Sequence, residues 1–187
     1  MGKTASPPNI LWGVTGSVAA IRADRLASSL GELGRLRVVV TDRAKHFRPA
    51  FPREVDVHDD EGEWREWEQL GDPVLHIELR KWADLFVIAP LSANTLAKIT
   101  AGIADNLLLS VARAWNYRVP FVVAPAMNTM MWDHPVTCRS LELFRSWGGH
   151  VVEPIEKELA CGDVGVGALA EADTIAAKVR ELLPRKG

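Results

Sequence analysis

Composition and charge suit a single globular domain. The chain has 187 residues, of which 48% are hydrophobic and 25% are charged, and this is enough to bury a sizeable core. A net charge of −2 without a Lys/Arg cluster argues against a nucleic-acid partner, and no apolar run is long enough to span a membrane.

The cysteines and the chain ends bear on the compartment and the domain limits. Cys138 and Cys161 form no CxxC pair and suggest no disulfide framework, so a reducing, cytoplasmic environment is expected. Residues 1–8 are short and polar, unlike a signal peptide, and are expected to form a flexible tail, as are residues 185–187. Residues 9–184 are predicted to form the one domain.

The first predicted element is a buried strand over residues 10–15, followed by Gly-Ser-Val-Ala-Ala at 16–20 and an amphipathic helix to about Leu33. Small residues at such a turn let the backbone approach a ligand, and a helix N-terminus attracts phosphate. Ser17 would add a hydroxyl there. A tight turn with Ser17 as the helix N-cap explains the same residues equally well.

A second predicted strand, over residues 36–40, ends in Thr41 and the basic residues Arg43 and His46. A hydroxyl and a base at a strand end can serve the same anion. The basic side chains can equally be solvated.

Residues 48–73, rich in Pro, Asp, Glu and Trp, are expected to be irregular, with a short strand at 55–57. The acidic run at 59–63 is interpreted as a solvated loop rather than a metal site, and no metal is predicted. Beyond it, His76 stands among the apolar residues of 74–79. Such a histidine is either a hydrogen-bonded core or capping residue or, because imidazole titrates near neutral pH, a general base.

A third strand is predicted at residues 85–89, and Pro90 is expected to end it because proline has no N–H to give the ladder. Ser-Ala-Asn-Thr at 92–95 then opens a helix and places hydroxyl and amide groups at its N-terminus. N-capping by Ser92 is the alternative explanation.

The next strand, at 121–124, is followed by Pro-Ala-Met-Asn-Thr-Met-Met-Trp at 125–132. Asn128 stands there among sulfur, aromatic and small residues, at the strand end where open parallel sheets bind ligands. Its amide can hold a carboxylate or another amide without adding charge, and it can also simply cap the next helix.

Glycines surround Cys161 in the segment 159–171, which is typical of a mobile loop that closes over a substrate. A thiol in such a loop differs from the buried, inert cysteine that is the usual alternative.

The remaining predicted elements are helices at 106–115, 137–147 and 172–183 and a last strand at 151–153. This alternation predicts an α/β fold, with a single doubly wound parallel sheet of five or six strands in a flavodoxin-like or Rossmann-like three-layer sandwich. Small and polar residues follow three strands, at 15–18, 89–95 and 124–128, and these strand ends are the predicted site of a phosphorylated cofactor.

Four stretches together resemble a known family. They are Gly-Ser-Val-Ala-Ala at 16–20, Ala-Pro-Leu-Ser-Ala-Asn-Thr at 89–95, the 125–132 stretch and Leu-Ala-Cys-Gly-Asp at 159–163. In this order they resemble the homo-oligomeric flavin-containing cysteine decarboxylases, and the likeness covers residues 9 to about 182. The resemblance implies the decarboxylation of 4′-phospho-N-pantothenoylcysteine to 4′-phosphopantetheine in coenzyme A synthesis.

The resemblance also implies the roles of individual residues. His76 would be the catalytic base, Cys161 the proton donor of the last step, and Asn128 and Ala160 would contact the substrate. The family forms homotrimers, or multiples of them, with each site at a subunit contact. Noncovalently bound FMN would be held by ten residues: Gly16, Ser17, Val18, Thr41, Phe47, Ser92, Ala93, Asn94, Thr95 and Ala126.

The implied chemistry accounts for these residue types. Oxidation of the thiol-bearing carbon by FMN gives a thioaldehyde, which accepts the electrons left when carbon dioxide departs, and reduction of the resulting ene-thiolate needs a proton donor such as a flap thiol. Three other functions remain open: a flavoprotein that regulates a protein phosphatase, a decarboxylase of peptidyl cysteine, and a flavodoxin-like electron carrier. Cys161 disfavours the peptide enzyme, because that chemistry has no reductive half.

Overall fold

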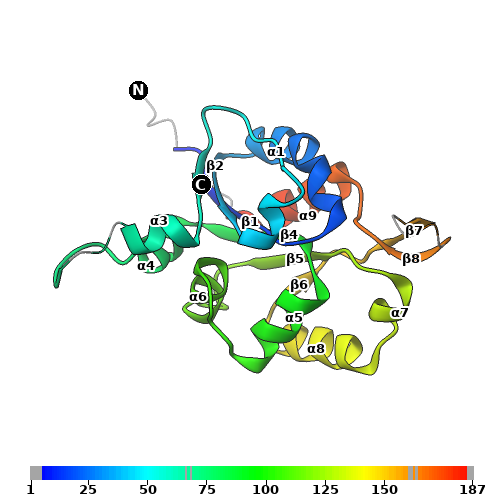
Figure 1. The fold of residues 1–187 in the computed structure, drawn as a ribbon. Helices are drawn as coiled ribbons and strands as arrows, with labels where there is room; N and C mark the ends of the chain where they lie inside the picture. Colours follow the sequence, from blue (N-terminus) through cyan, green and yellow to red (C-terminus); the bar gives the residue numbers. More distant parts are fainter. Residues whose placement is uncertain (1–5, 66, 68, 160–161, 163, 185–187) are drawn as a thin grey trace.

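A six-stranded parallel sheet forms the centre of the computed structural model, which describes residues 6–65, 67, 69–159, 162 and 164–184 (Figure 1). Its strands are β1 (Asn9–Val14), β2 (Arg35–Val40), β3 (Asp56–His58), β4 (Leu85–Leu91), β5 (Phe121–Pro125) and β6 (His150–Val151). The order across the sheet is β3-β2-β1-β4-β5-β6, and every neighbouring pair is parallel. The predicted doubly wound α/β fold is confirmed.

Helices connect the strands. They are η1 (Val18–Arg22), α1 (Ala23–Gly31), α2 (Asp42–Lys45), α3 (Asp60–Arg65), α4 (Leu75–Trp82), α5 (Ala93–Ala101), α6 (Leu107–Arg113), α7 (Thr129–Trp132), α8 (Pro135–Ser146) and α9 (Ala172–Leu182). A separate antiparallel hairpin is formed by β7 (Ile155–Glu158) and β8 (Val164–Ala168). Among the described residues, no helix is both long and apolar enough to cross a membrane.

Two helical layers cover the sheet, one on each face (Figure 1). In β1, Trp12 belongs to the core under α1 and α9, whereas its neighbour Leu11 belongs to the core under α4, α5, α6 and α8. The same alternation separates Val87 from Phe86 in β4. Apolar side chains at every position of a strand therefore reflect burial on both faces, as expected for a parallel sheet.

The strand order reverses between β1 and β4, since the chain builds outward from β1 to β3 and then returns to the other side of β1. In open parallel sheets the helices leave opposite faces at such a reversal, and ligands bind beyond the carboxyl ends of the two strands. The topology therefore selects the ends of β1, β4 and β5, three adjacent strands, as the place for a ligand.

Several local predictions are corrected by the structure. Pro90 lies inside β4 instead of ending it. The β4–β5 pairing is irregular between Ile88 and Leu91, so the ladder needs no hydrogen bond from an N–H at residue 90. The segment 48–73, expected to be irregular, contains α3 as well as β3. Part of the glycine-rich segment after Glu158 forms β8, paired with β7.

The hairpin packs against the segment that follows β5. The backbone N–H of Met127 donates to the carbonyl of Gly167 at 2.9 Å. Gly167 has a φ of +148°, and a Cβ there would stand 2.1 Å from the Met127 carbonyl oxygen. Only glycine permits this approach, which sets the base of the predicted flap beside Asn128. Ala160 and Cys161, predicted to contact substrate and donate a proton, lie outside the described residues.

Candidate functional site: a polar edge at the carboxyl ends of β1, β4 and β5

Thr15 joins the ends of β1 and β4. Its buried hydroxyl donates to the Pro90 carbonyl at 2.7 Å and accepts from the backbone N–H of Ser92 at 2.8 Å. The hydroxyl thus holds the turn after β4 next to the turn after β1, although the two turns are far apart in sequence. The two helices that follow therefore begin beside each other.

Ser17 closes the same edge toward β5. Its hydroxyl accepts from the N–H of Ala19 at 3.4 Å, as the N-cap of η1, and donates to the Ala126 carbonyl at 3.3 Å. Ala126 is itself tied to β4, because its N–H donates to the Leu91 carbonyl at 3.0 Å. The capping explanation for Ser17 is confirmed, and the cap lies among the predicted cofactor residues.

Ser92 is the N-cap of α5. Its hydroxyl accepts from the N–H of Thr95 at 3.2 Å and lies 3.1 Å from the Thr95 hydroxyl. Ala93 and Asn94 form the first turn, with Asn94 exposed. The helix therefore presents two hydroxyls and an amide around its N-terminal N–H groups, and this is a suitable setting for an anion.

The segment after β2 borders this edge as well. The buried Thr41 donates its N–H to the Val14 carbonyl at 3.1 Å, and α2 follows directly. A Cβ at Gly16 would stand 2.6 Å from the Cβ of Arg43, so the glycine is what lets α2 approach the first turn. Phe47, half-buried, packs against the core shared by α1 and α9.

All ten predicted cofactor residues therefore follow four adjacent strands at one edge of the sheet: Gly16, Ser17 and Val18 after β1, Thr41 and Phe47 after β2, Ser92, Ala93, Asn94 and Thr95 after β4, and Ala126 after β5. Their polar groups are hydroxyls, one amide and backbone N–H groups, with no carboxylate among them. This donor set suits the phosphate of a flavin mononucleotide, because it supplies hydrogen bonds without adding negative charge.

Asn128 is the N-cap of α7, with its side-chain oxygen accepting from the N–H of Met130 at 2.8 Å. The capping explanation is thus confirmed. The cap also fixes the side chain at the carboxyl end of β5, next to the β7–β8 hairpin, so capping and a substrate contact are compatible.

His76 lies elsewhere in the chain, near the start of α4. Figure 1 shows α3 and α4 at one end of the molecule and α7 with the hairpin at the other end. The imidazole Nδ1 is 2.6 Å from a carboxylate oxygen of Glu63 on α3. One copy of the chain therefore does not bring His76 and Asn128 together.

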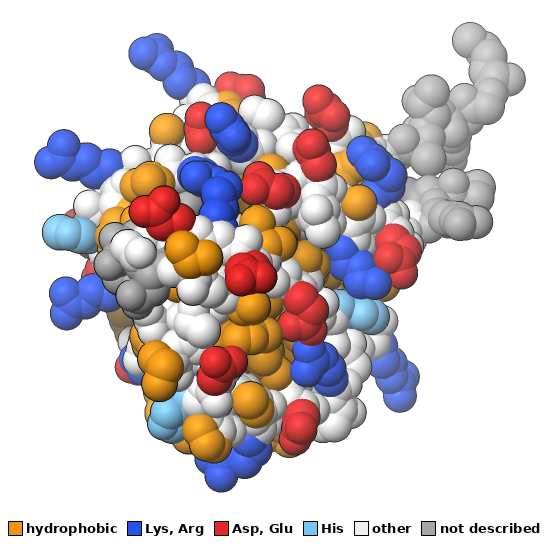
Figure 2. Space-filling model, turned by 90° about the vertical axis from the view of Figure 1, so that its right-hand side faces the viewer, with side chains coloured by type: hydrophobic (Ala, Val, Ile, Leu, Met, Phe, Trp, Pro, Cys, Tyr) orange, Lys and Arg blue, Asp and Glu red, His pale blue; other side chains and the backbone are white. Residues whose placement is uncertain are grey.

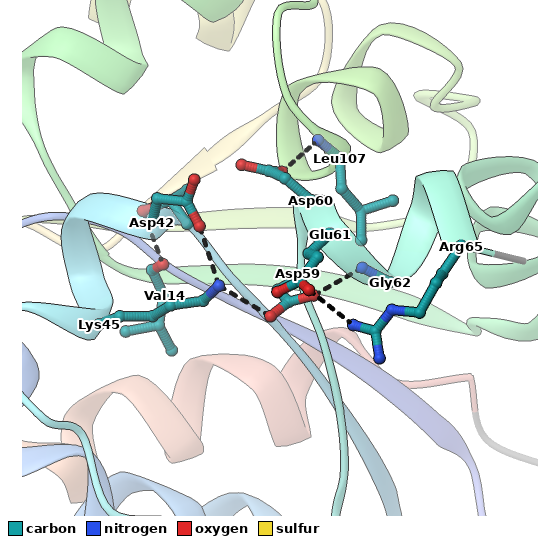
Figure 3. A network of polar contacts seen from close by, with 10 residues as sticks. Val14, Asp42, Lys45, Asp59, Asp60, Glu61, Gly62, Arg65 and Leu107 are labelled. Atoms are coloured by element: carbon teal, nitrogen blue, oxygen red, sulfur yellow. Dashed lines mark hydrogen bonds and ion pairs between the residues drawn. The ribbon is translucent and has the colours of Figure 1, made fainter.

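The acidic run at 59–63 is not the solvated loop that was expected. Asp59 accepts from the N–H of Gly62 at 2.8 Å and pairs with Lys45 at 2.8 Å, and Asp60 accepts from the N–H of Leu107 at 2.8 Å (Figure 3). All four acidic side chains of the run thus have defined partners, since Glu63 contacts His76 and Glu61 contacts Arg65. Only the i,i+4 spacing of Glu61 and Arg65 is visible in the sequence, because the other three acidic residues pair with other segments of the chain.

These contacts shift the pKa values of the acidic cluster formed by Asp59, Asp60 and their partner Lys45. Hydrogen bonds to Asp59 and Asp42 raise the pKa of Lys45, and the Lys45 contact lowers the pKa of Asp59. Burial raises the pKa of Asp60. Because Lys45 belongs to α2, the cluster connects the Thr41–Phe47 segment with the start of α3.

Both ends of the molecule expose large apolar side chains. At the α3–α4 end, Trp64 is 75% and Leu70 is 97% exposed. At the other end, Met130 on α7 is 77% and Val164 on β8 is 74% exposed. Figure 2 looks onto this second end and shows hydrophobic side chains gathered between charged ones.

Comparison with known proteins identifies flavoproteins as relatives of this chain. A model of the flavoprotein family matches residues 2–184. A rice protein (Oryza sativa subsp. japonica), phosphopantothenoylcysteine decarboxylase, is 51% identical over 177 residues, which cover 94% of this chain and 80% of the relative.

Two solved structures are similar as well. A mutant PPC decarboxylase complexed with pantothenoylaminoethenethiol has a TM-score of 0.91 and 50% identity, covering 93% of this chain and 97% of that one. The FMN-binding protein AtHal3 has a TM-score of 0.88 and 50% identity, covering 94% of this chain and 96% of that one. The chain belongs to the flavoprotein family, on its phosphopantothenoylcysteine decarboxylase branch.

Proposed function

We propose that this flavoprotein decarboxylates 4′-phospho-N-pantothenoylcysteine to 4′-phosphopantetheine, a step of coenzyme A synthesis. The observation that carries the proposal is the likeness, at 50% identity and a TM-score of 0.91, to a decarboxylase that holds an ene-thiol derivative of pantothenate. An ene-thiol is what an oxidised cysteine becomes after it loses carbon dioxide. A cytoplasmic location, where a reactive thiol stays reduced, is part of the proposal.

FMN is the cofactor of this reaction. Ser92 and Thr95 at the N-terminus of α5, and Ser17 at the first turn, would hold its phosphate. When bound, FMN supplies a two-electron oxidation of the thiol-bearing carbon and returns the electrons after carbon dioxide has left.

Asn128 holds the substrate carboxylate with its amide, and the α7 cap keeps that amide in place. Ala160 contacts the substrate, and Cys161 gives its proton to carbon in the last step. The packing of Gly167 on Met127 holds the described part of the hairpin beside Asn128.

His76 acts as the base in the site of a neighbouring copy. Because His76 and Asn128 lie at opposite ends of one chain, a site that uses both is built from two copies (Figure 1). The two ends of the chain expose different apolar side chains, so the contact between copies joins unlike surfaces. The α3–α4 end of one copy packs against the α7–hairpin end of the next. Such a head-to-tail contact closes into a ring, here a homotrimer.

Product analysis tests the reaction. Wild type and Cys161→Ser, each loaded with FMN, are incubated anaerobically with phosphopantothenoylcysteine, and the products are measured by mass spectrometry. Wild type should give phosphopantetheine, and Cys161→Ser a species two hydrogens lighter. If neither protein releases carbon dioxide, the decarboxylase proposal is wrong, and capture and inhibition of a protein phosphatase becomes the assay to run.

Mixing two inactive variants tests the shared site. His76→Asn and Asn128→Asp are each expected to be inactive, and co-expressed copies should recover about a quarter of wild-type activity, because that share of the contacts in a ring joins two intact residues. Light scattering should give the mass of three chains. No recovery from a mixed trimer would contradict a site built from two copies.

A further inference from the structure

Glu63 and His76 form a close pair between α3 and α4. One carboxylate oxygen of Glu63 lies 2.6 Å from Nδ1 of His76. The two side chains are mostly withdrawn from solvent, with exposed fractions of 13% for Glu63 and 27% for His76. This pair differs from the other acidic contacts of α3, since its partner is the side chain proposed as the catalytic base.

The chemistry of the two groups fixes the proton between them. A carboxylate only accepts hydrogen bonds, so the contact requires the proton on Nδ1 of the imidazole. In a neutral ring, Nε2 then carries the lone pair and is the nitrogen that can take a proton from substrate. We infer that Glu63 is the positioning residue of His76, which holds the ring in place and in the tautomer that makes Nε2 the base; this rests on the proposed function.

The start of α3 is built to hold Glu63 in that position. Asp59 caps the turn through Gly62 and is fixed by Lys45, and the Asp60 carboxylate binds the N-terminal N–H of α6 at Leu107 (Figure 3). Two anchors therefore immobilise the turn from which Glu63 extends toward α4.

Helical spacing sorts the acidic residues of α3 by direction. Asp60 and Glu63, three residues apart, share the face that meets α6 and α4. Glu61 points elsewhere: its side chain is 76% exposed and contacts Arg65 one turn on, at 3.6 Å. The same short run thus supplies a matched control, an acidic residue of the same helix without a histidine partner.

The variants separate orientation from general damage to α3. Glu63→Met keeps the length of the side chain but has no acceptor for Nδ1–H, whereas Glu63→Gln keeps an acceptor oxygen. Glu61→Gln is the control, and His76→Asn measures the loss of the base itself. All are studied as FMN-loaded trimers.

Kinetics provide the first measurement. Glu63→Met should lower kcat about 10- to 100-fold with KM changed by less than about two-fold, which is less than the loss in His76→Asn because the base remains. Glu63→Gln should restore most of kcat, and Glu61→Gln should match wild type. A Glu63→Gln enzyme no more active than Glu63→Met would overturn the inference.

Nitrogen-15 NMR of labelled histidines provides a measurement that does not depend on turnover. The chain has five histidines, and the signals missing in His76→Asn identify those of His76. At a pH where the ring is neutral, wild type should show a protonated Nδ1 and an unprotonated Nε2, and Glu63→Met should shift both toward the other tautomer. Unchanged shifts in Glu63→Met would overturn the inference. If His76→Asn kept full activity, the assignment of His76 as the catalytic base would be wrong. The nitrogen-15 shifts would still decide whether Glu63 sets the tautomer of His76.

Discussion

Gly167 is the position where one methyl group should separate the hairpin from the substrate site. In Gly167→Ala the new Cβ would lie 2.1 Å from the Met127 carbonyl oxygen, and the backbone φ of +148° disfavours any side chain. Carbon and oxygen atoms that are not bonded need more than about 3 Å, so the two segments must move apart by about 1 Å. That movement breaks the 2.9 Å hydrogen bond from Met127 to Gly167.

The energies involved determine whether Gly167→Ala unfolds the domain or only displaces the hairpin. Backbone strain of about 1–3 kcal/mol and a lost hydrogen bond of about 1 kcal/mol are small beside the 5–15 kcal/mol or so that holds a domain together. The hairpin should therefore move away while the sheet stays folded. A displacement of about 1 Å at a catalytic site costs about 100-fold in rate.

Activity and thermal stability should therefore separate in this variant. We expect kcat/KM of Gly167→Ala to fall about 100-fold, FMN to remain bound, and the Tm to change by less than about 4 °C. Gly148→Ala is the matched control, since its φ of +96° is also positive but its Cβ would lie 3.5 Å from the nearest atom, the Tyr117 carbonyl oxygen. Wild-type activity in Gly167→Ala, or an equal loss in Gly148→Ala, would refute the reasoning.

Three further predictions concern single groups. Asn128→Asp should abolish turnover while FMN absorbance persists, because a second negative charge would face the substrate carboxylate. Asp59→Asn should lower the Tm at pH 7, and this difference should shrink as the pH falls below the ordinary Asp pKa of 3.8: Lys45 lowers the folded-state pKa of Asp59, so the stabilisation exists above the unfolded pKa and disappears as pH falls through the folded one. Burial raises the pKa of Tyr117, the single tyrosine, to about 12, so its phenolate absorbance should appear near pH 12 while the fold persists, and stability should fall with rising pH above about 10. A Tm difference in Asp59→Asn that does not shrink as the pH falls below 3.8, or ordinary titration of Tyr117 near pH 10, would contradict these assignments.

Local sequence determined the elements that depend on local chemistry. The apolar runs before Gly16, Ser92 and Asn128 predict the three strands, since a strand buried on both faces is apolar at every position. The caps at Ser17, Ser92 and Asn128 follow from side chains that bond to their own backbone. The alternation of strands and helices then predicts a doubly wound sheet and a ligand at the strand ends.

Tertiary structure decided what depends on contacts between distant segments. Pro90 continues its strand because an irregular pairing with β5 tolerates a missing N–H. That irregularity could not be predicted, because the sequence does not say which strand pairs with β4. Asp59, Asp60 and Glu63 look like a solvated run until Lys45, Leu107 and His76 arrive from other parts of the chain. Likewise, the separation of His76 and Asn128 follows from the fold, which places α4 and α7 at opposite ends of the molecule (Figure 1). Short-range hydrogen bonding and burial can be read along the chain, whereas the partners of a charge depend on how the whole chain folds.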